Sequence, residues 1–111
     1  MSKARISHEK ATIESFRRKP EFAAEYLNSV LEDGDRAELL IALRRMAAAY
    51  GGVATLARKA DLNVNSLYRT LSHKGNPELK SLSALLRAMG MRLAVQTISS
   101  KPRLGQSARV A

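Results

Sequence analysis

The chain has 111 residues, of which 45% are apolar and 26% are charged, and it contains no cysteine. This length predicts one domain with a modest core, while the lack of cysteine excludes disulfides and thiolate metal sites and suits a reducing compartment. Apolar runs such as residues 39–43 are far shorter than the roughly 20 residues of a membrane span, and no secretory signal begins the chain. We therefore expect a cytoplasmic protein.

The charge is distributed unevenly along the chain. Nineteen Lys and Arg against ten Asp and Glu give a net charge of +9. Residues 21–50 carry three basic and six acidic side chains, whereas residues 51–100 carry seven basic and two acidic ones and residues 101–111 carry three basic ones and no acid. A basic section beside an acidic one predicts a polyanion-binding face, with nucleic acid as the first candidate.

Helical spacing of apolar residues dominates the first half of the chain. A first helix is expected from about His8 to Arg18, and a second begins at Pro20 and ends at Gly34. Asp35 is typical of the N-cap of a third helix, with Glu38 completing a capping box, and Gly51-Gly52 ends that helix. The apolar anchors of these helices are Ala11, Ile13, Phe16, Phe22, Ala23, Tyr26, Leu27, Val30, Leu31, Leu39, Leu40, Leu43, Met46, Ala47 and Tyr50.

Shorter elements follow in the second half. Residues 53–60 predict a helix of two turns, and residues 61–63 predict a tight connection. A further helix is expected through Leu67 and Leu71, with Asn63 or Asn65 as its cap. Residues 74–77 contain the glycine and proline of a helix-breaking sequence, and another helix follows them and ends at Gly90. The inward face of that last helix is Leu79, Leu82, Leu85, Leu86 and Met89.

The spacing of apolar residues changes from helical to alternating at residues 91–98. There Leu93 and Val95 alternate with polar residues, which indicates a β-strand. We therefore expect a mainly α protein of five or six helices with one short C-terminal strand. Residues 8–98 would form the single domain, and residues 1–7 and 99–111 would be flexible tails.

Residues 53–72 fit a helix-turn-helix. Ala57 supplies the small residue that two closely crossing helices need, and Asp61 tolerates the left-handed turn where glycine is usual. Amide and guanidinium side chains suit the reading of adenine and guanine edges in a major groove. The other interpretation is a plain pair of antiparallel helices with a solvated face. The outward positions of the second helix are Asn63, Asn65, Ser66, Tyr68, Arg69 and Ser72.

The sequence also resembles the addiction-module antidote proteins over roughly residues 20–98. The resemblance is carried by Tyr26-Leu27-Asn28, by residues 50–57, by Leu67-Tyr-Arg-Thr-Leu-Ser72, by Gly75-Asn-Pro77 and by Gly90-Met-Arg-Leu93. It implies a small prophage-associated protein with a lambda/Cro-repressor-like helix-turn-helix, an antitoxin that represses its own operon and neutralises a toxin. Asp61 and Val64 depart from the family pattern, and Val64 puts base hydrogen bonding at that position in doubt.

Candidate site residues follow from this motif. We assign base reading to Asn63, Asn65, Ser66 and Arg69, and contacts to the DNA backbone to Thr55, Tyr68, Ser72, His73 and Lys74. His73 could instead be merely exposed, and Tyr68 could instead be part of the packing. The alternative function is an antitoxin that binds its toxin through protein contacts with little or no DNA binding.

Enzyme chemistry finds little support in the sequence. His8 and His73 are far apart and have no glutamate or cysteine at ligand spacing. The acidic residues Glu32, Asp33 and Asp35 lack the number and spacing of a calcium site, so helix capping and solvation explain them better. We expect no catalytic residue, no metal and no cofactor.

A single strand at residues 91–98 cannot be stable alone, because its backbone groups would lack partners. We therefore expect a homodimer in which two such strands pair antiparallel, with Leu93 and Val95 resting on the helices. The alternative is a hairpin with residues 104–110. Two recognition helices about one DNA turn apart would then read a palindromic operator in double-stranded DNA.

Overall fold

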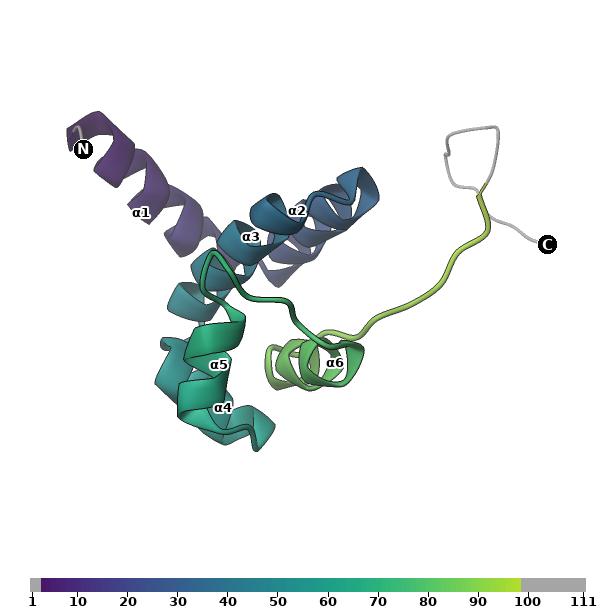
Figure 1. Cartoon of the computed structure of the whole chain (residues 1–111). Coiled ribbons are helices and arrows are strands. Elements are labelled where there is room, and N and C mark those ends of the chain that lie inside the picture. The colour runs from purple at the N-terminus through teal and green to yellow at the C-terminus, as the bar shows by residue number, and fades with distance from the viewer. Residues whose placement is uncertain (1–2, 99–111) are drawn as a thin grey trace.

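Six α-helices make up the described part of the chain, and Figure 1 shows their arrangement in the computed structural model. The structure describes residues 3–98, with side chains from residue 8 onward. The helices in chain order are α1 (Lys3–Arg18), α2 (Pro20–Asp33), α3 (Arg36–Ala49), α4 (Val53–Ala60), α5 (Val64–Thr70) and α6 (Leu79–Ala88). The expected mainly helical fold is confirmed.

The start of α1 differs from the expectation. The helix begins at Lys3 rather than near His8, so residues 3–7 are helical backbone instead of a flexible tail. Lys, Ala and Arg favour helix without needing an apolar stripe, which is the signal that the sequence lacks there. Residues 1–2 and 99–111 of the expected tails lie outside the described residues.

The boundary between α2 and α3 follows the local sequence. Pro20 stands in the first turn of α2, and Gly34 closes the helix at φ 72° while its N–H donates to the Leu31 carbonyl over 3.2 Å. The Asp35 carboxylate accepts a hydrogen bond of 2.9 Å from the Ala37 N–H. The described side chains show no return bond from Glu38, so only half of the expected capping box is present.

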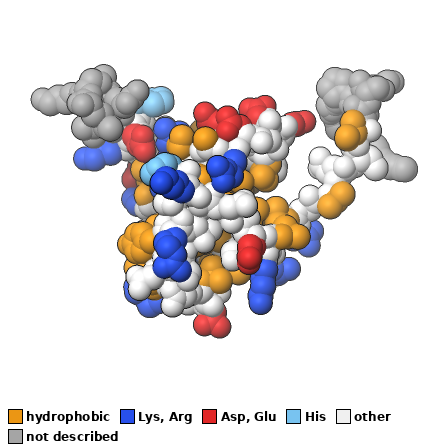
Figure 2. Space-filling view, in the orientation of Figure 1, with side chains coloured by type: hydrophobic (Ala, Val, Ile, Leu, Met, Phe, Trp, Pro, Cys, Tyr) orange, Lys and Arg blue, Asp and Glu red, His pale blue; other side chains and the backbone are white. Residues whose placement is uncertain are grey.

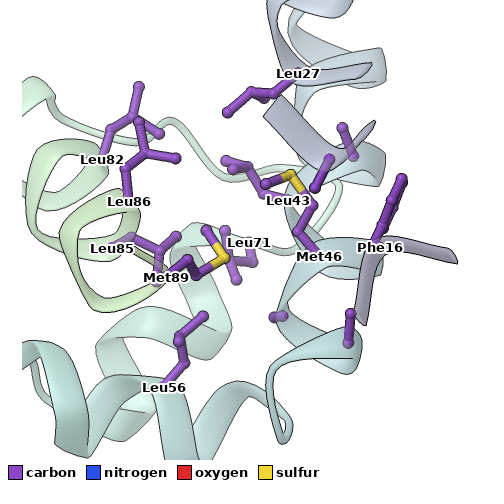
Figure 3. Close-up of a cluster of buried hydrophobic side chains, with 14 of the residues drawn as sticks. Phe16, Leu27, Leu43, Met46, Leu56, Leu71, Leu82, Leu85, Leu86 and Met89 are labelled. Atoms are coloured by element: carbon purple, nitrogen blue, oxygen red, sulfur yellow. The ribbon is translucent and has the colours of Figure 1, made fainter. Parts of the chain in front are cut away.

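The three long helices pack around Phe16, which is fully buried. Its ring centroid lies 5.0 Å from that of Tyr26 and 5.5 Å from that of Phe22. Leu27, Leu43 and Met46 extend this cluster toward the second half of the molecule (Figure 3). Each such buried side chain contributes about 1.5–3 kcal/mol relative to its exposed state.

Arg45 ties α1, α2 and α3 together at the edge of this cluster. Its guanidinium donates to the Tyr26 hydroxyl over 3.1 Å and to the Glu9 carboxylate over 3.5 Å. Burial alone would lower the pKa of Arg45, but the bonds to Tyr26 and Glu9 outweigh it and raise that pKa. The side chain therefore stays charged and fixes α1 to its two neighbours.

The second half of the fold is built on α4, which contacts α3, α5 and α6. Leu56 of α4 points toward Leu71, Leu85 and Met89 in one apolar cluster (Figure 3). All four side chains are buried. Leu79 differs from the expected apolar face of α6, because at the first residue of that helix it is 72% exposed.

Residues 91–98 form an extended arm rather than the expected β-strand, and no strand occurs within residues 3–98. Figure 1 shows the arm leaving the body beyond α6. Leu93 packs partly against the core, as expected, whereas Val95 is 98% exposed. A strand needs a neighbouring strand for its backbone hydrogen bonds, and one copy of the described chain offers none.

Within residues 3–98, no single helix is long and apolar enough to cross a membrane. Taken together, α3 and α4 meet the length and composition of a span, but they are bent by 88° at the break between them.

Candidate nucleic-acid interface

The candidate interface is built on the α4–α5 pair, two short helices joined by residues 61–63. Asp61 ends α4 in the left-handed conformation, at φ 59° and ψ 45°, as its sequence position predicts. The Leu62 N–H then donates to the Ala57 carbonyl over 2.8 Å and closes the turn. Ala57 is fully buried, so the absence of a larger side chain lets the two helices approach.

The second helix begins at a cap formed by Asn63. Its side-chain oxygen accepts a hydrogen bond of 2.8 Å from the Ser66 N–H, and this confirms one of the two expected caps. The oxygen is therefore occupied within the protein. Reading an adenine edge takes both the oxygen and the NH₂ group of an asparagine, so Asn63 is less suited to that role than Asn65.

The outer face of α5 is polar. Asn65, Ser66, Tyr68 and Arg69 are exposed, and Ser72 just beyond the helix is half-buried. The Arg69 guanidinium donates to the Ser66 hydroxyl over 3.3 Å, while the Ser72 hydroxyl donates to the Arg69 carbonyl over 2.7 Å. Asn65, Tyr68, Arg69 and Ser72 are spaced three or four residues apart, so they share one side of the helix.

The loop after α5 presents His73 and Lys74, both exposed, beside the end of that helix. It turns sharply at Gly75, which is buried. A side chain there would collide with the Thr70 carbonyl, so the loop can pack against the last turn of α5 only with glycine at this position.

Two arginines of α3 fix this loop from behind. Arg44 donates to the Leu71 carbonyl, and Arg36 donates to the Gly75 carbonyl over 3.2 Å. These carbonyls lie at the end of α5 and at the turn after it, where no helical partner is available. The sequence analysis missed both arginines as positioning residues. The available signal was that they are basic residues within the acidic section of the chain.

The electrostatics of this surface favour an anion. Residues 62–77 contain no aspartate or glutamate, whereas they contain Arg69, His73 and Lys74. Figure 2 shows Lys and Arg side chains over α5 and its following loop. Many of the Asp and Glu side chains gather where α2 ends and α3 begins, and a few others lie apart from that group. A phosphate backbone could approach α5 without meeting a carboxylate on this stretch of chain.

The other site candidates lie on other elements. Thr55 is exposed in the first turn of α4, and Leu93 and Val95 are on the arm rather than beside α5. No group of three or more His, Cys, Asp or Glu side chains that could bind a metal ion occurs in the part of the chain that the structure describes. The arrangement is therefore a surface of hydrogen-bond donors and positive charge.

A family model described as "Probable addiction module antidote protein" matches residues 8–97. The chain belongs to this antidote family. An uncharacterized protein of Haemophilus influenzae is 30% identical over 71 residues, which are 64% of this chain and 72% of that relative. No solved structure matches the antidote chain. Membership of an antidote family suggests an antitoxin role and implies a toxin partner.

Proposed function

We propose that this antitoxin binds double-stranded DNA in a sequence-specific way and represses the operon that encodes it. In this proposal the α4–α5 pair is a lambda-repressor-like helix-turn-helix, and α5 enters the major groove. The proposal rests chiefly on the outer face of α5. Its exposed amide, hydroxyl and guanidinium groups lie on a helix that is capped at its start and fixed by arginines after its end.

Each polar group on this surface has a role in the proposal. Arg69 can reach a guanine edge and Asn65 an adenine edge, and Ser66 can contribute to either base contact. Asn63 contributes its remaining N–H donors while its oxygen caps α5. The contacts to phosphate oxygens come from Thr55, Tyr68, Ser72, His73 and Lys74.

The proposal includes a homodimer. A helix of seven residues reaches only a few base pairs, whereas two copies related by a twofold axis read two half-sites. A dimer that binds both half-sites at once also has a far higher overall affinity than a single copy on one half-site.

A second candidate function is an antitoxin that binds its toxin and has little or no DNA binding. The acidic surface of α2 and the start of α3 favours this second function. All carboxylates of that surface are exposed. The two salt bridges of the described side chains use Glu14 and Glu9, which lie outside that surface. A toxin that cleaves RNA needs basic groups for its own substrate, and such groups would suit this surface. The exposed acids are Glu21, Glu25, Glu32, Asp33, Asp35 and Glu38.

The two functions separate in one titration of the purified protein without any toxin. Labelled DNA from upstream of the gene is compared with the same bases in shuffled order, in the presence of unlabelled competitor DNA. Saturable binding to the native order that resists competitor supports the proposal. Equal binding to both DNAs, or none, contradicts it and leaves the protein-contact function.

A further inference from the structure

The arm at residues 91–98 has an unpartnered backbone. The Met91 N–H donates to the Leu86 carbonyl over 2.8 Å and so fixes the root of the arm to the end of α6. Beyond it, the backbone groups of residues 92–98 make no hydrogen bond to any other part of residues 3–98. An extended segment with free N–H and C=O groups is a template for another strand.

The side chains of the arm are also unpartnered. Val95 is 98% exposed and Ile98 is fully exposed, although both are large apolar residues. Figure 2 shows hydrophobic side chains along the arm that stand clear of the body. Leu93, by contrast, already packs partly against the core. The arm therefore carries apolar surface that its own copy leaves in water.

An open groove lies beside the root of the arm, between it and α2. The apolar part of its lining includes Leu27 and Leu31 of α2, Leu86 of α6 and Leu93 of the arm itself. Asn28 and Glu32 line its α2 side. Leu31 is on the surface despite its size, so this groove, like the tip of the arm, exposes apolar area to water.

We propose that this groove receives the arm of a second copy of the chain, and that each copy receives the other's arm. The incoming arm pairs antiparallel with the free backbone of residues 92–96, and its Val95 rests on Leu31, the exposed leucine of the α2 wall. Paired strands lie about 4.8 Å apart, so the incoming strand lies next to the wall that the resident arm forms. The inference rests on the homodimer of the proposed function and specifies the surfaces that form it.

Charge complementarity favours this occupant. Glu32 lines the groove, and Glu21 and Glu25 lie on the same side of α2 outside its lining, because the three are separated by four and seven residues. The chain that continues from the arm contains Lys101, Arg103 and Arg109 and no acidic residue. By sequence, a second copy of the chain is therefore complementary in charge to this acidic side of α2.

A second copy also satisfies both unpartnered surfaces at once. In a twofold dimer each protomer contributes the same two patches, so two arms fill two grooves and each arm is paired along the edge that faces the other arm.

The absence of cysteine makes the test direct, since any thiol in a variant is an engineered one. A Leu31→Cys copy with a mass tag is mixed with an untagged Val95→Cys copy and treated with a short thiol-reactive cross-linker. The expected product is a covalent dimer of one tagged and one untagged copy. The matched control replaces Leu31→Cys by Ser29→Cys, which is exposed on the opposite side of α2 and should give no such product.

Light scattering of the unmodified chain at micromolar concentration gives the mass independently of any cross-link, and two copies of 12.2 kDa are expected. Glu32→Lys, present in both copies, should raise the dissociation constant of the dimer about tenfold, as expected when a twofold dimer loses two equivalent exposed ion pairs. Glu38→Lys, which reverses an exposed charge outside the groove lining, should leave that constant unchanged.

Three results would overturn the inference. A monomer in light scattering removes the dimer altogether. A dimer without the mixed product of Leu31→Cys and Val95→Cys means that the copies meet elsewhere, which leaves the proposed DNA-binding function standing. The third result uses one chain that carries both Leu31→Cys and Val95→Cys. A cross-link between these two positions within that chain, without a covalent dimer, means that the arm folds back on its own groove.

Discussion

The α2–α3 pair and the α4–α5 pair use the same backbone devices at their turns. In the first pair Gly34 is left-handed and Asp35 caps the next helix through a 2.9 Å hydrogen bond. In the second pair Asp61 is left-handed and Asn63 caps through a 2.8 Å hydrogen bond. Both turns satisfy the same free backbone groups at the helix ends.

The two pairs differ in what they present to solvent. Residues 21–38 contain six acidic residues and one basic residue, Arg36, whereas residues 62–77 contain no acid. They also differ in support, because the end of α5 and its loop are bonded to two arginines of α3. Turn chemistry therefore determines the fold of both pairs, while the outward side chains and their anchoring distinguish what each can bind.

The largest expected effect comes from Gly75→Ala, which disturbs the anchoring of the second pair only. The new Cβ would collide with the Thr70 carbonyl, and this backbone cannot move without displacing the end of α5. We expect a loss of about 3 kcal/mol in the free energy of unfolding, measured by urea denaturation, together with loss of DNA binding.

Gly34→Ala is the matched control in the first pair. It has φ 72° but open space around its Cβ, so only backbone strain of about 1 kcal/mol is expected. Equal losses for the two variants would contradict the close approach at Gly75.

The next effect concerns DNA affinity. Arg69→Ala removes an exposed guanidinium from α5 and should weaken operator binding by about 1–3 kcal/mol, with relaxed preference at one base pair. Lys74→Ala should weaken binding to native and shuffled DNA alike, because a phosphate contact carries no sequence information. Both are measured by titration against variants of the operator. Equal losses on the two DNAs for Arg69→Ala would reduce that residue to a phosphate contact.

The two capping residues, Asn63 and Asp35, offer a paired test in which each substitution should change the free energy of unfolding by about 1 kcal/mol. Asn63→Ala and Asp35→Ala each remove a side-chain acceptor from a helix start, so each should lower the free energy of unfolding by about that amount. Only Asn63→Ala should also lower DNA affinity, since it loosens α5. A change in base preference with unchanged stability would instead assign Asn63 to base reading.

The smallest effect is a stabilisation. Asp61→Gly places the residue that tolerates φ 59° best at the turn of the second pair, and we expect a gain of about 0.5 kcal/mol and a raised melting temperature. DNA binding should change little, since Asp61 precedes α5. A destabilised variant would show that the Asp61 carboxylate makes a contribution beyond its backbone conformation.

Much of the fold follows from local sequence. The bounds of α4, the left-handed Asp61 and the ends of α2 at Pro20 and Gly34 follow from propensity and capping chemistry. These signals lie within a few residues of the feature that they determine. The same holds for the apolar faces of α3 and α6, although Leu79 is exposed because it lies at the start of its helix.

The remaining features depend on contacts between distant parts of the chain. The need for glycine at position 75 arises from the Thr70 backbone. The loop position arises from Arg36, which precedes its partner Gly75 by 39 residues, and from Arg44, which precedes its partner Leu71 by 27. Residues 91–98 read as a strand because they alternate, but a strand forms only when a second strand is present. The exposed candidates of the site were predictable from helical spacing. The sequence left two choices for the cap of α5, Asn63 or Asn65, and the structure shows Asn63 in that role.

The bonds from Arg36 and Arg44 place α3 in both surfaces at once. Its first residue follows the acidic turn directly, and the same residue is bonded to the loop that presents Lys74. If α5 binds DNA as proposed, a ligand of the acidic surface that shifts α3 would also shift the arginines that hold the end of α5 and its loop, and would so change the affinity for DNA. Such coupling is reciprocal. If bound operator DNA lowers the affinity of the protein for this ligand by some factor, the bound ligand lowers the affinity for operator DNA by the same factor.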